Sequence, residues 1–190
     1  MAKLELNALL AALQGTIGDL VFVREGDSMH VRRRARKGPA PSTSQLAQNS
    51  RFGVASRWAR TLLTDPAMRA AYQRGCHGHL TPHNVAVSDF LNAPVIESIR
   101  LESYKGKPGD VIQLIAKDDF RIVRCTVQVR SVDGAILEEG EAERSALENT
   151  TWLYTSQIEI APETTVLIEA SAVDLPGNRA TARAFYYVAA

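Results

Sequence analysis

The stretch AKDDFRIVRCTVQV, residues 116–129, decides the fold class of the C-terminal half of this 190-residue chain. After the turn residues KDD, apolar residues alternate with polar residues at positions 124, 126 and 128. Successive side chains of a β-strand point to opposite faces, so a period of two predicts a strand with one buried face. We expect this strand to span residues 121–130. Its buried face should consist of Val123, Cys125, Val127 and Val129.

The same period of two recurs on both sides of this strand, after the tripeptide NAP at residues 92–94. Turn sequences rich in Gly, Pro and Asp separate the alternating segments, namely KGKPGD (105–110), KDD (117–119), VDGA (132–135) and LPGN (175–178). Several short strands divided by such turns indicate an antiparallel β-sandwich. We expect seven strands, at 95–103, 111–116, 121–130, 135–142, 151–158, 165–173 and 180–188.

Three features of this half resemble bacterial immunoglobulin-like domains: the stretch at 116–129, Trp152 at the fifth strand, and ASAVDLPGNRATA (170–182) before the last strand. The resemblance covers about half of the chain and implies a sandwich fold. The Cys–Trp–Cys pattern of antibody domains is absent, so no disulfide between sheets is implied. The first half is similar to uncharacterised bacterial proteins that join a GxIGDLVF hairpin (15–22), a basic Pro-rich segment and short helices to such a sandwich. That similarity implies an architecture and no activity.

The segment from residue 20 to residue 34 predicts a β-hairpin. LVFVR and MHVRRR flank a turn that contains Gly and Asp. Pairing Arg24 with Met29 places Phe22 opposite Val31, and the expected buried face is then Leu20, Phe22, Met29 and Val31. Residues 4–13 alternate but are rich in Ala and Leu, so a strand and a helix are both compatible. A strand is favoured because a hairpin follows.

Three helices are expected between the hairpin and residue 92. The first should run from about Gln45 to Leu63, after the Pro-rich segment KGPAPSTS, with Ser42 or Ser44 as N-cap. Its apolar arc comprises Phe52, Val54, Ala55, Trp58, Ala59, Leu62 and Leu63. Arg51 falls inside this arc, so that end of the helix either docks with a paired Arg or faces a partner. TDPAMRAAYQRG (64–75) and TPHNVAVSDFLN (81–92) each place a capping residue before Pro, which is typical of a helix start.

Together these patterns predict an α+β N-terminal region, a β-hairpin plus three short helices, over residues 1–92. An all-β immunoglobulin-like sandwich should follow over residues 95–190. The two parts differ in charge. Residues 1–92 hold 12 Lys and Arg against 6 Asp and Glu, a net +6, whereas residues 93–190 hold 10 against 15, a net −5. This asymmetry indicates two domains and a polar partner, and it could equally let the two halves of the chain, or two copies of it, attract each other.

Location and redox environment follow from composition. The N-terminal sequence is interrupted by Glu5 and Asn7, so it does not resemble a signal peptide. No apolar run is long enough for a transmembrane helix, so we expect no membrane insertion. Cys76 and Cys125 lie in segments of different character and do not indicate a disulfide framework. We expect a cytoplasmic location or an assembled particle.

Motifs for catalysis and metal binding are weak. Cys76, His79 and His83 in CHGHLTPH have zinc-like spacing but lack an evident fourth ligand, so a polar loop is the preferred interpretation. Asp118, Asp119, Asp133 and Asp174 could gather as a calcium site, but Asp before Gly or Pro is ordinary turn chemistry. No GxSxG or phosphate-loop sequence occurs. We therefore expect no enzyme activity, no cofactor and no bound metal.

The basic segment at residues 32–37 is the strongest functional feature of the sequence. It allows three interpretations: a solvated loop, a grip on nucleic-acid phosphates, or an assembly contact. We favour a structural protein that forms a homo-oligomer, as in a filament, an appendage or a virus-like particle, with a nucleic-acid-associated protein as the alternative. The contact residues in either case are Arg32, Arg34, Arg36, Lys37 and Arg51.

Overall fold

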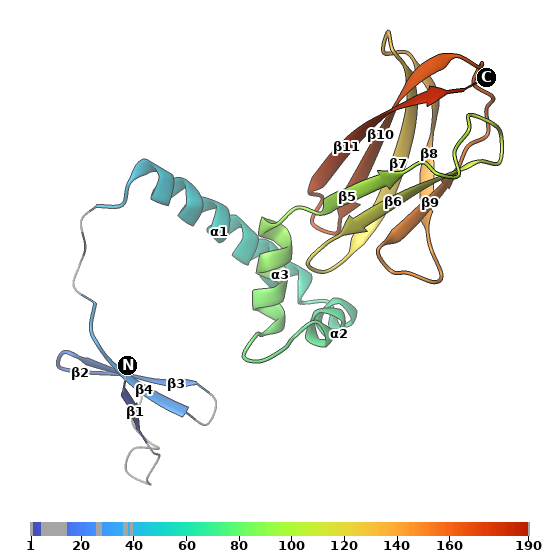
Figure 1. Ribbon diagram of the computed structural model, residues 1–190. Coiled ribbons are helices and arrows are strands. Elements are labelled where there is room, and N and C mark those ends of the chain that lie inside the picture. Colours follow the sequence, from blue (N-terminus) through green and yellow to red (C-terminus); the bar gives the residue numbers. More distant parts are fainter. Residues whose placement is uncertain (1, 5–14, 26–27, 36–37, 39, 190) are drawn as a thin grey trace. The chain divides into compact units, whose positions relative to one another are not determined.

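A computed structural model of the chain describes residues 2–4, 15–25, 28–35, 38 and 40–189 (Figure 1). The chain divides into two compact units, Met1–Thr43 and Ser44–Ala190. The three helices and the C-terminal sandwich lie in the second unit, and the N-terminal sheet lies in the first.

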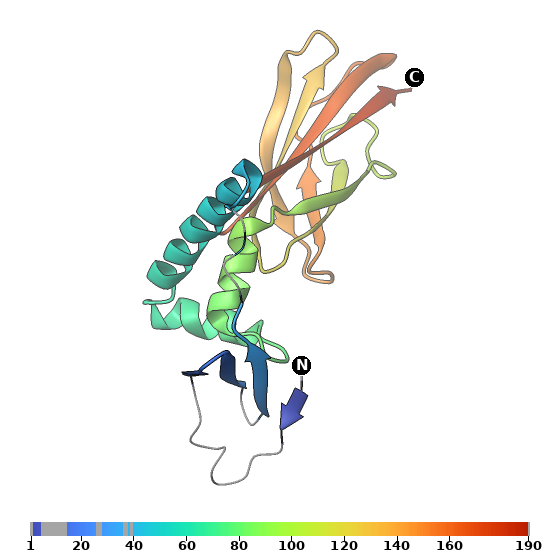
Figure 2. The same cartoon turned by 90° about the vertical axis from the view of Figure 1, so that its left-hand side faces the viewer.

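The sandwich is built from one antiparallel sheet in the strand order β11-β10-β7-β8-β9-β6-β5. The seven predicted strands are confirmed, with ends that differ by three residues or fewer. They are β5 (Val95–Arg100), β6 (Val111–Lys117), β7 (Ile122–Ser131), β8 (Ile136–Arg144), β9 (Thr151–Thr155), β10 (Thr164–Asp174) and β11 (Arg179–Val188). The neighbouring strands β10 and β11 run side by side in red in Figure 2.

The sheet folds into two layers because β8 changes partner along its length. Its residues up to Ala142 pair with β7, whereas Glu143 and Arg144 pair with β9. The apolar sides of the two layers then face each other and form the main core. The largest fully buried apolar side chains of this core are Tyr104, Ile112, Leu114, Val127, Val129, Val166 and Ile168.

The predicted buried face of β7 needs one correction. Cys125, Val127 and Val129 are buried as expected, but Val123 is 46% exposed and Ile122, 5% exposed, takes its place in the core. The register between β7 and β10 shifts at this point, because Val173 pairs with Arg124 and Asp174 pairs with Ile122. The extra residue makes a β-bulge that turns Val123 outward, which alternation alone does not predict.

Three helices precede the sandwich: α1 (Thr43–Leu62), α2 (Pro66–Arg74) and α3 (Pro82–Leu91). The predicted caps of α2 and α3 are confirmed, since Asp65 and Thr81 each accept a hydrogen bond from the first turn of their helix. The helices form a second small core of Ala55, Ala59, Leu63, Tyr72, Val85, Ala86 and Val87, against which Phe120 and Leu175 of the sandwich pack. No helix in the described residues is long and apolar enough to cross a lipid bilayer.

The apolar arc predicted for α1 is buried only in the second half of the helix. Phe52 and Val54 were expected inside, but both are exposed. The reason is length. An α-helix rises 1.5 Å per residue, and α1 has 20 residues whereas α2 has 9 and α3 has 10. The two shorter helices therefore cover only part of the length of α1.

The N-terminal unit is a four-stranded antiparallel sheet in the order β1-β4-β3-β2. Its strands are β1 (Ala2–Leu4), β2 (Gly15–Ile17), β3 (Leu20–Glu25) and β4 (Ser28–Arg33). The predicted register is confirmed, because Arg24 pairs with Met29 and Phe22 with Val31. Of the expected buried face, Met29 is buried, Phe22 and Val31 are half-buried and Leu20 is exposed. The strand predicted at residues 4–13 lies almost wholly outside the described residues.

Candidate functional site

The basic segment begins on β4 and continues beyond its end. Arg32 pairs with Val21 and Arg33 with Leu20 across the hairpin, and both Arg side chains are exposed. Arg34 is also exposed, and its backbone N–H donates to the carbonyl of Asp19 at 2.7 Å. Arg36 and Lys37 lie outside the described residues.

Arg51 has a contact within its own unit. Its Nη2 donates to the carbonyl oxygen of Leu91, the last residue of α3, at 2.7 Å. The guanidinium therefore satisfies one of the carbonyls left open at a helix C-terminus, where positive charge is favourable. The bond ties Arg51 to α3, although the apolar side chain of Phe52 beside it is exposed.

The weak zinc candidates are not brought together. Cys76 Sγ donates to the carbonyl of Tyr72, His83 Nε2 lies 3.3 Å from Ser56 Oγ, and His79 is exposed. In the described part of the chain, the one group of three or more metal-type ligands excludes all three residues. That group consists of Asp89, Asp118 and Asp174.

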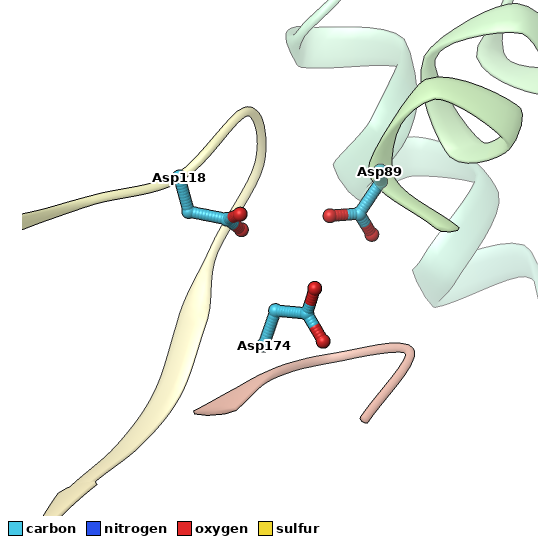
Figure 3. A group of neighbouring side chains, drawn as sticks. All are labelled: Asp89, Asp118 and Asp174. Atoms are coloured by element: carbon cyan, nitrogen blue, oxygen red, sulfur yellow. The ribbon is translucent and has the colours of Figure 1, made fainter. Parts of the chain in front are cut away.

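Three different elements supply these carboxylates. Asp89 lies in the last turn of α3, Asp118 follows β6, and Asp174 is the last residue of β10. Figure 3 shows the three side chains pointing toward one another. One carboxylate oxygen from each lies within 4.8 Å of the others. The group therefore sits where the helices meet the turns at one end of the sandwich.

Hydrogen bonds hold each carboxylate in place. Tyr72 Oη donates to Asp89 Oδ2, and the backbone N–H of Arg121 donates to Asp118 Oδ2 at 2.8 Å. Asp174 accepts at both oxygens: Oδ1 from the backbone N–H groups of Gly177 and Asn178, and Oδ2 from the Asn178 side chain. The same Asn178 nitrogen lies within 3.4 Å of the carbonyls of Asp89, Phe90 and Asn92, which ties the turn after β10 to the end of α3.

The group is buried and electrostatically unfavourable as it stands. Asp89 is 0% and Asp174 1% exposed, and Asp118 is half-buried. Burial, assisted by the neighbouring carboxylates of Asp118, Asp174 and Asp119, raises the pKa of Asp89 to about 7, against the hydrogen bond from Tyr72. Burial also raises the pKa of Asp118. Each carboxylate makes the ionised form of its neighbours more costly.

Two oxygens of the group have no hydrogen-bond partner in the part of the chain that the structure describes. These are Asp89 Oδ1 and Asp118 Oδ1, both of them inaccessible to solvent. A buried polar atom without a partner costs about 1–3 kcal/mol, and more when it carries charge. Native proteins rarely leave such atoms without a water, an ion or a functional reason.

Sequence reasoning identified two of the three acids and missed the third. Asp118 and Asp174 were among the four turn acids considered for calcium, whereas Asp133 is exposed in the β7–β8 turn and is not part of the group. Asp119, the fourth of these acids, lies next to the group and accepts hydrogen bonds from Ser88 and Asn92. The sequence position of Asp89 could have identified it, because it follows Val85 by four residues and therefore lies on the same, buried face of α3.

An acidic groove lies on the sandwich. It has a volume of about 770 Å³ and follows β8 where that strand passes from one layer to the other. Glu138 is buried and anchored by Ser156 Oγ and the backbone N–H of Gln157. The exposed acids that line the groove are Glu139, Glu141 and Glu143, and Glu141 also approaches Arg124 at 3.9 Å.

Comparison with known proteins gives no family. No protein-family profile matches the chain, and the search of curated proteins found no significant match. Among solved structures, CopC from Methylosinus trichosporium OB3b is similar with a TM-score of 0.37 and 9% identity, over 48% of this chain and 89% of CopC. The sulfane dehydrogenase SoxCD from Paracoccus pantotrophus is similar with a TM-score of 0.32 and 19% identity, over 46% of this chain and 22% of that one. At these TM-scores neither likeness carries functional information.

Proposed function

We propose that this protein is a non-enzymatic structural subunit, built from an N-terminal sheet and an immunoglobulin-like sandwich, that self-associates into a filament, an appendage or a virus-like particle. The contacts between copies are made by the N-terminal strands and by the basic segment that follows them. A second copy of the chain is the partner that its own charge distribution favours.

The observation that carries this proposal is the state of the N-terminal sheet. Among its described side chains only Met29 is buried, while the apolar side chains of Ile17, Leu20 and Val23 are exposed. Sheets of this size need packing against another layer to be stable. The outer strands β1 and β2 also present edges to which a strand of another chain can add.

Charge complementarity supports a second copy as the partner. Arg32, Arg33 and Arg34 are exposed on and after β4, and the groove along β8 presents three exposed Glu side chains. Partly exposed ion pairs contribute about 1 kcal/mol or less each, so they set orientation and association rate more than affinity. The apolar side chains of the N-terminal sheet supply the larger part of the association energy.

A charge-swap experiment tests the proposal. Arg32→Glu, Arg33→Glu and Arg34→Glu together should weaken self-association at low salt, and Glu139→Lys, Glu141→Lys and Glu143→Lys together should do the same. Mixing the two variants should restore association, because each presents the charge that the other has lost. Light scattering coupled to size exclusion, over a range of protein and salt concentrations, gives the masses.

Two results would contradict self-assembly. A wild-type protein that stays monomeric at every concentration would mean that the N-terminal sheet and the basic segment do not form a contact between copies. Alternatively, the Arg variant could assemble normally but lose a nucleic-acid affinity that falls steeply with salt in the wild type. The basic segment would then be a phosphate grip.

A further inference from the structure

We propose that Asp89, Asp118 and Asp174 form a calcium-binding site that fastens α3 to the end of the sandwich.

The spacing of the three carboxylates suits one ion. One oxygen from each lies within 4.8 Å of the others, and the side chains converge on a common point (Figure 3). Calcium binds oxygen at about 2.3–2.6 Å, so two oxygens on opposite sides of one ion lie up to about 5 Å apart. A single ion between them can therefore contact all three residues.

Two buried carboxylate oxygens of the group have no hydrogen-bond partner among the described residues. Asp89 is fully buried, and its Oδ1 has no hydrogen-bond partner. Asp118 is half-buried, but its Oδ1 is inaccessible to solvent and also lacks a partner. In both residues the other oxygen is fixed by a hydrogen bond, from Tyr72 to Asp89 and from a backbone N–H to Asp118. The bonds hold the carboxylates in position and leave one oxygen of each for a ligand, as supporting bonds do in metal sites.

The charge of the group also favours a cation. The ion pairs among the described side chains join Lys117 to Glu97, Arg124 to Glu141 and Arg183 to Glu169, so none of these pairs neutralises a carboxylate of the group. Buried carboxylates are normally paired with a cation, coordinated to a metal or protonated. Three of them within one ion's reach repel each other in the absence of a positive charge.

The donor set selects the class of metal. All three side chains offer oxygen, and the group contains no His or Cys. Carboxylate oxygens suit hard cations such as calcium and magnesium, whereas zinc and copper favour nitrogen and sulfur. Calcium accepts irregular geometry with 6–8 oxygens, including bidentate carboxylates and water, whereas magnesium requires a near-ideal octahedron. Ligands from a helix, a turn and a strand end fit the more tolerant ion better.

The test uses the full-length protein stripped of metal with a chelator. Added calcium chloride should bind at one ion per chain in isothermal titration calorimetry. At saturation it should raise the melting temperature by about 5–10 °C, the shift expected at a hundredfold excess over Kd for a chain of this size. Magnesium chloride at the same concentration should give a clearly smaller shift, and an equal shift would overturn the choice of calcium.

Two variants remove ligands and one serves as a matched control. Asp89→Asn and Asp118→Asn should each weaken calcium binding about tenfold or more, because affinity follows the number of charged ligands. Without calcium, Asp89→Asn should melt higher than the wild type, because it removes one of three mutually repelling charges. Asp133→Asn changes an exposed turn acid outside the group and should leave both calcium affinity and melting temperature unchanged.

Terbium luminescence locates the site independently of stability. Terbium replaces calcium at oxygen-rich sites and is excited by a nearby aromatic ring, here Tyr72, which donates to Asp89. The wild type and Asp133→Asn should show sensitised emission that calcium displaces, and Asp118→Asn should reach the same emission only at about tenfold higher terbium concentration or more. If Asp89→Asn does not fold, Asp118→Asn decides, since that side chain is half-buried. Failure of the wild type to bind calcium, or binding that both variants retain unchanged, would overturn the proposal.

Discussion

The N-terminal sheet and the C-terminal sandwich both contain strands in which apolar and polar residues alternate, yet their apolar side chains lie in different surroundings. In β7 and β10 every second side chain is buried over most of the strand. In the N-terminal sheet, with the same alternation in β3 and β4, Met29 alone among the described side chains is buried. The same sequence pattern therefore precedes a core in one region and an exposed face in the other.

The difference shows which property alternation determines. Alternation indicates the face on which most side chains lie, and the register predicted for the N-terminal hairpin is confirmed. Burial needs a second layer as well. The sandwich makes that layer itself because β8 passes from one half of the sheet to the other, while four short strands do not fold over one another.

The largest effect is expected in the centre of the sandwich. Val127 is fully buried in β7, so Val127→Asp places an unpaired charge in the core and should cost about 4 kcal/mol or more. Thermal and chemical denaturation should show an unfolded or strongly destabilised protein at room temperature.

The matched control is Val123→Asp in the same strand. Because the bulge turns Val123 outward, this substitution should cost about 1 kcal/mol or less. Equal losses from the two substitutions would mean that β7 continues its simple alternation through residue 123, as the sequence alone predicted.

The second prediction concerns the N-terminal sheet. Among the described side chains of this sheet, Met29 is the buried one, and Met29→Ala truncates it. The substitution should lower the free energy of unfolding of the sheet by about 2–5 kcal/mol, enough to unfold so small a sheet. Limited proteolysis with mass spectrometry should show faster cleavage before residue 44. The melting temperature of the sandwich should not move, because the sheet and the sandwich belong to separate compact units.

Val23→Ala is the control in this sheet, since Val23 is exposed on β3, and cleavage should be unchanged. A large drop in the melting temperature of the sandwich with Met29→Ala would show that the two units share a core. The comparison between a region with a core and a region without one would then fail.

Much of the fold could be predicted because its signals are local. Capping residues before Pro66 and Pro82 mark the starts of α2 and α3, and turn residues mark the ends of the strands. The bulge at Val123 could not be predicted in this way, because it depends on how β7 pairs with β10. The exposure of Phe52 likewise depends on how far α2 and α3 reach along α1, which is a property of packing.

The candidate metal site was only partly within reach of sequence reasoning. Asp118 and Asp174 stand out as turn acids, but their convergence with Asp89 spans 85 positions of the chain, from a helix to the end of β10. No short-range spacing in the sequence indicates that these three residues lie close together. The position of Asp89 on the buried face of α3 was the one sequence feature that pointed to the site. A buried carboxylate indicates that some group pairs with it, but the sequence does not identify that group.

The smallest effect is expected where α1 passes from exposed to buried. Gly53 has helical geometry, and a Cβ added there would meet only the flexible end of Arg57, at 3.7 Å. Gly53→Ala should therefore stabilise the protein by about 0.5–1 kcal/mol, because Ala loses less backbone freedom in a helix. The melting temperature should rise by about 1–4 °C. A fall would mean that this part of α1 is covered in solution. If that fall appeared only at concentrations where the protein self-associates, the neighbouring side chains of Phe52 and Val54 would belong to the contact between copies.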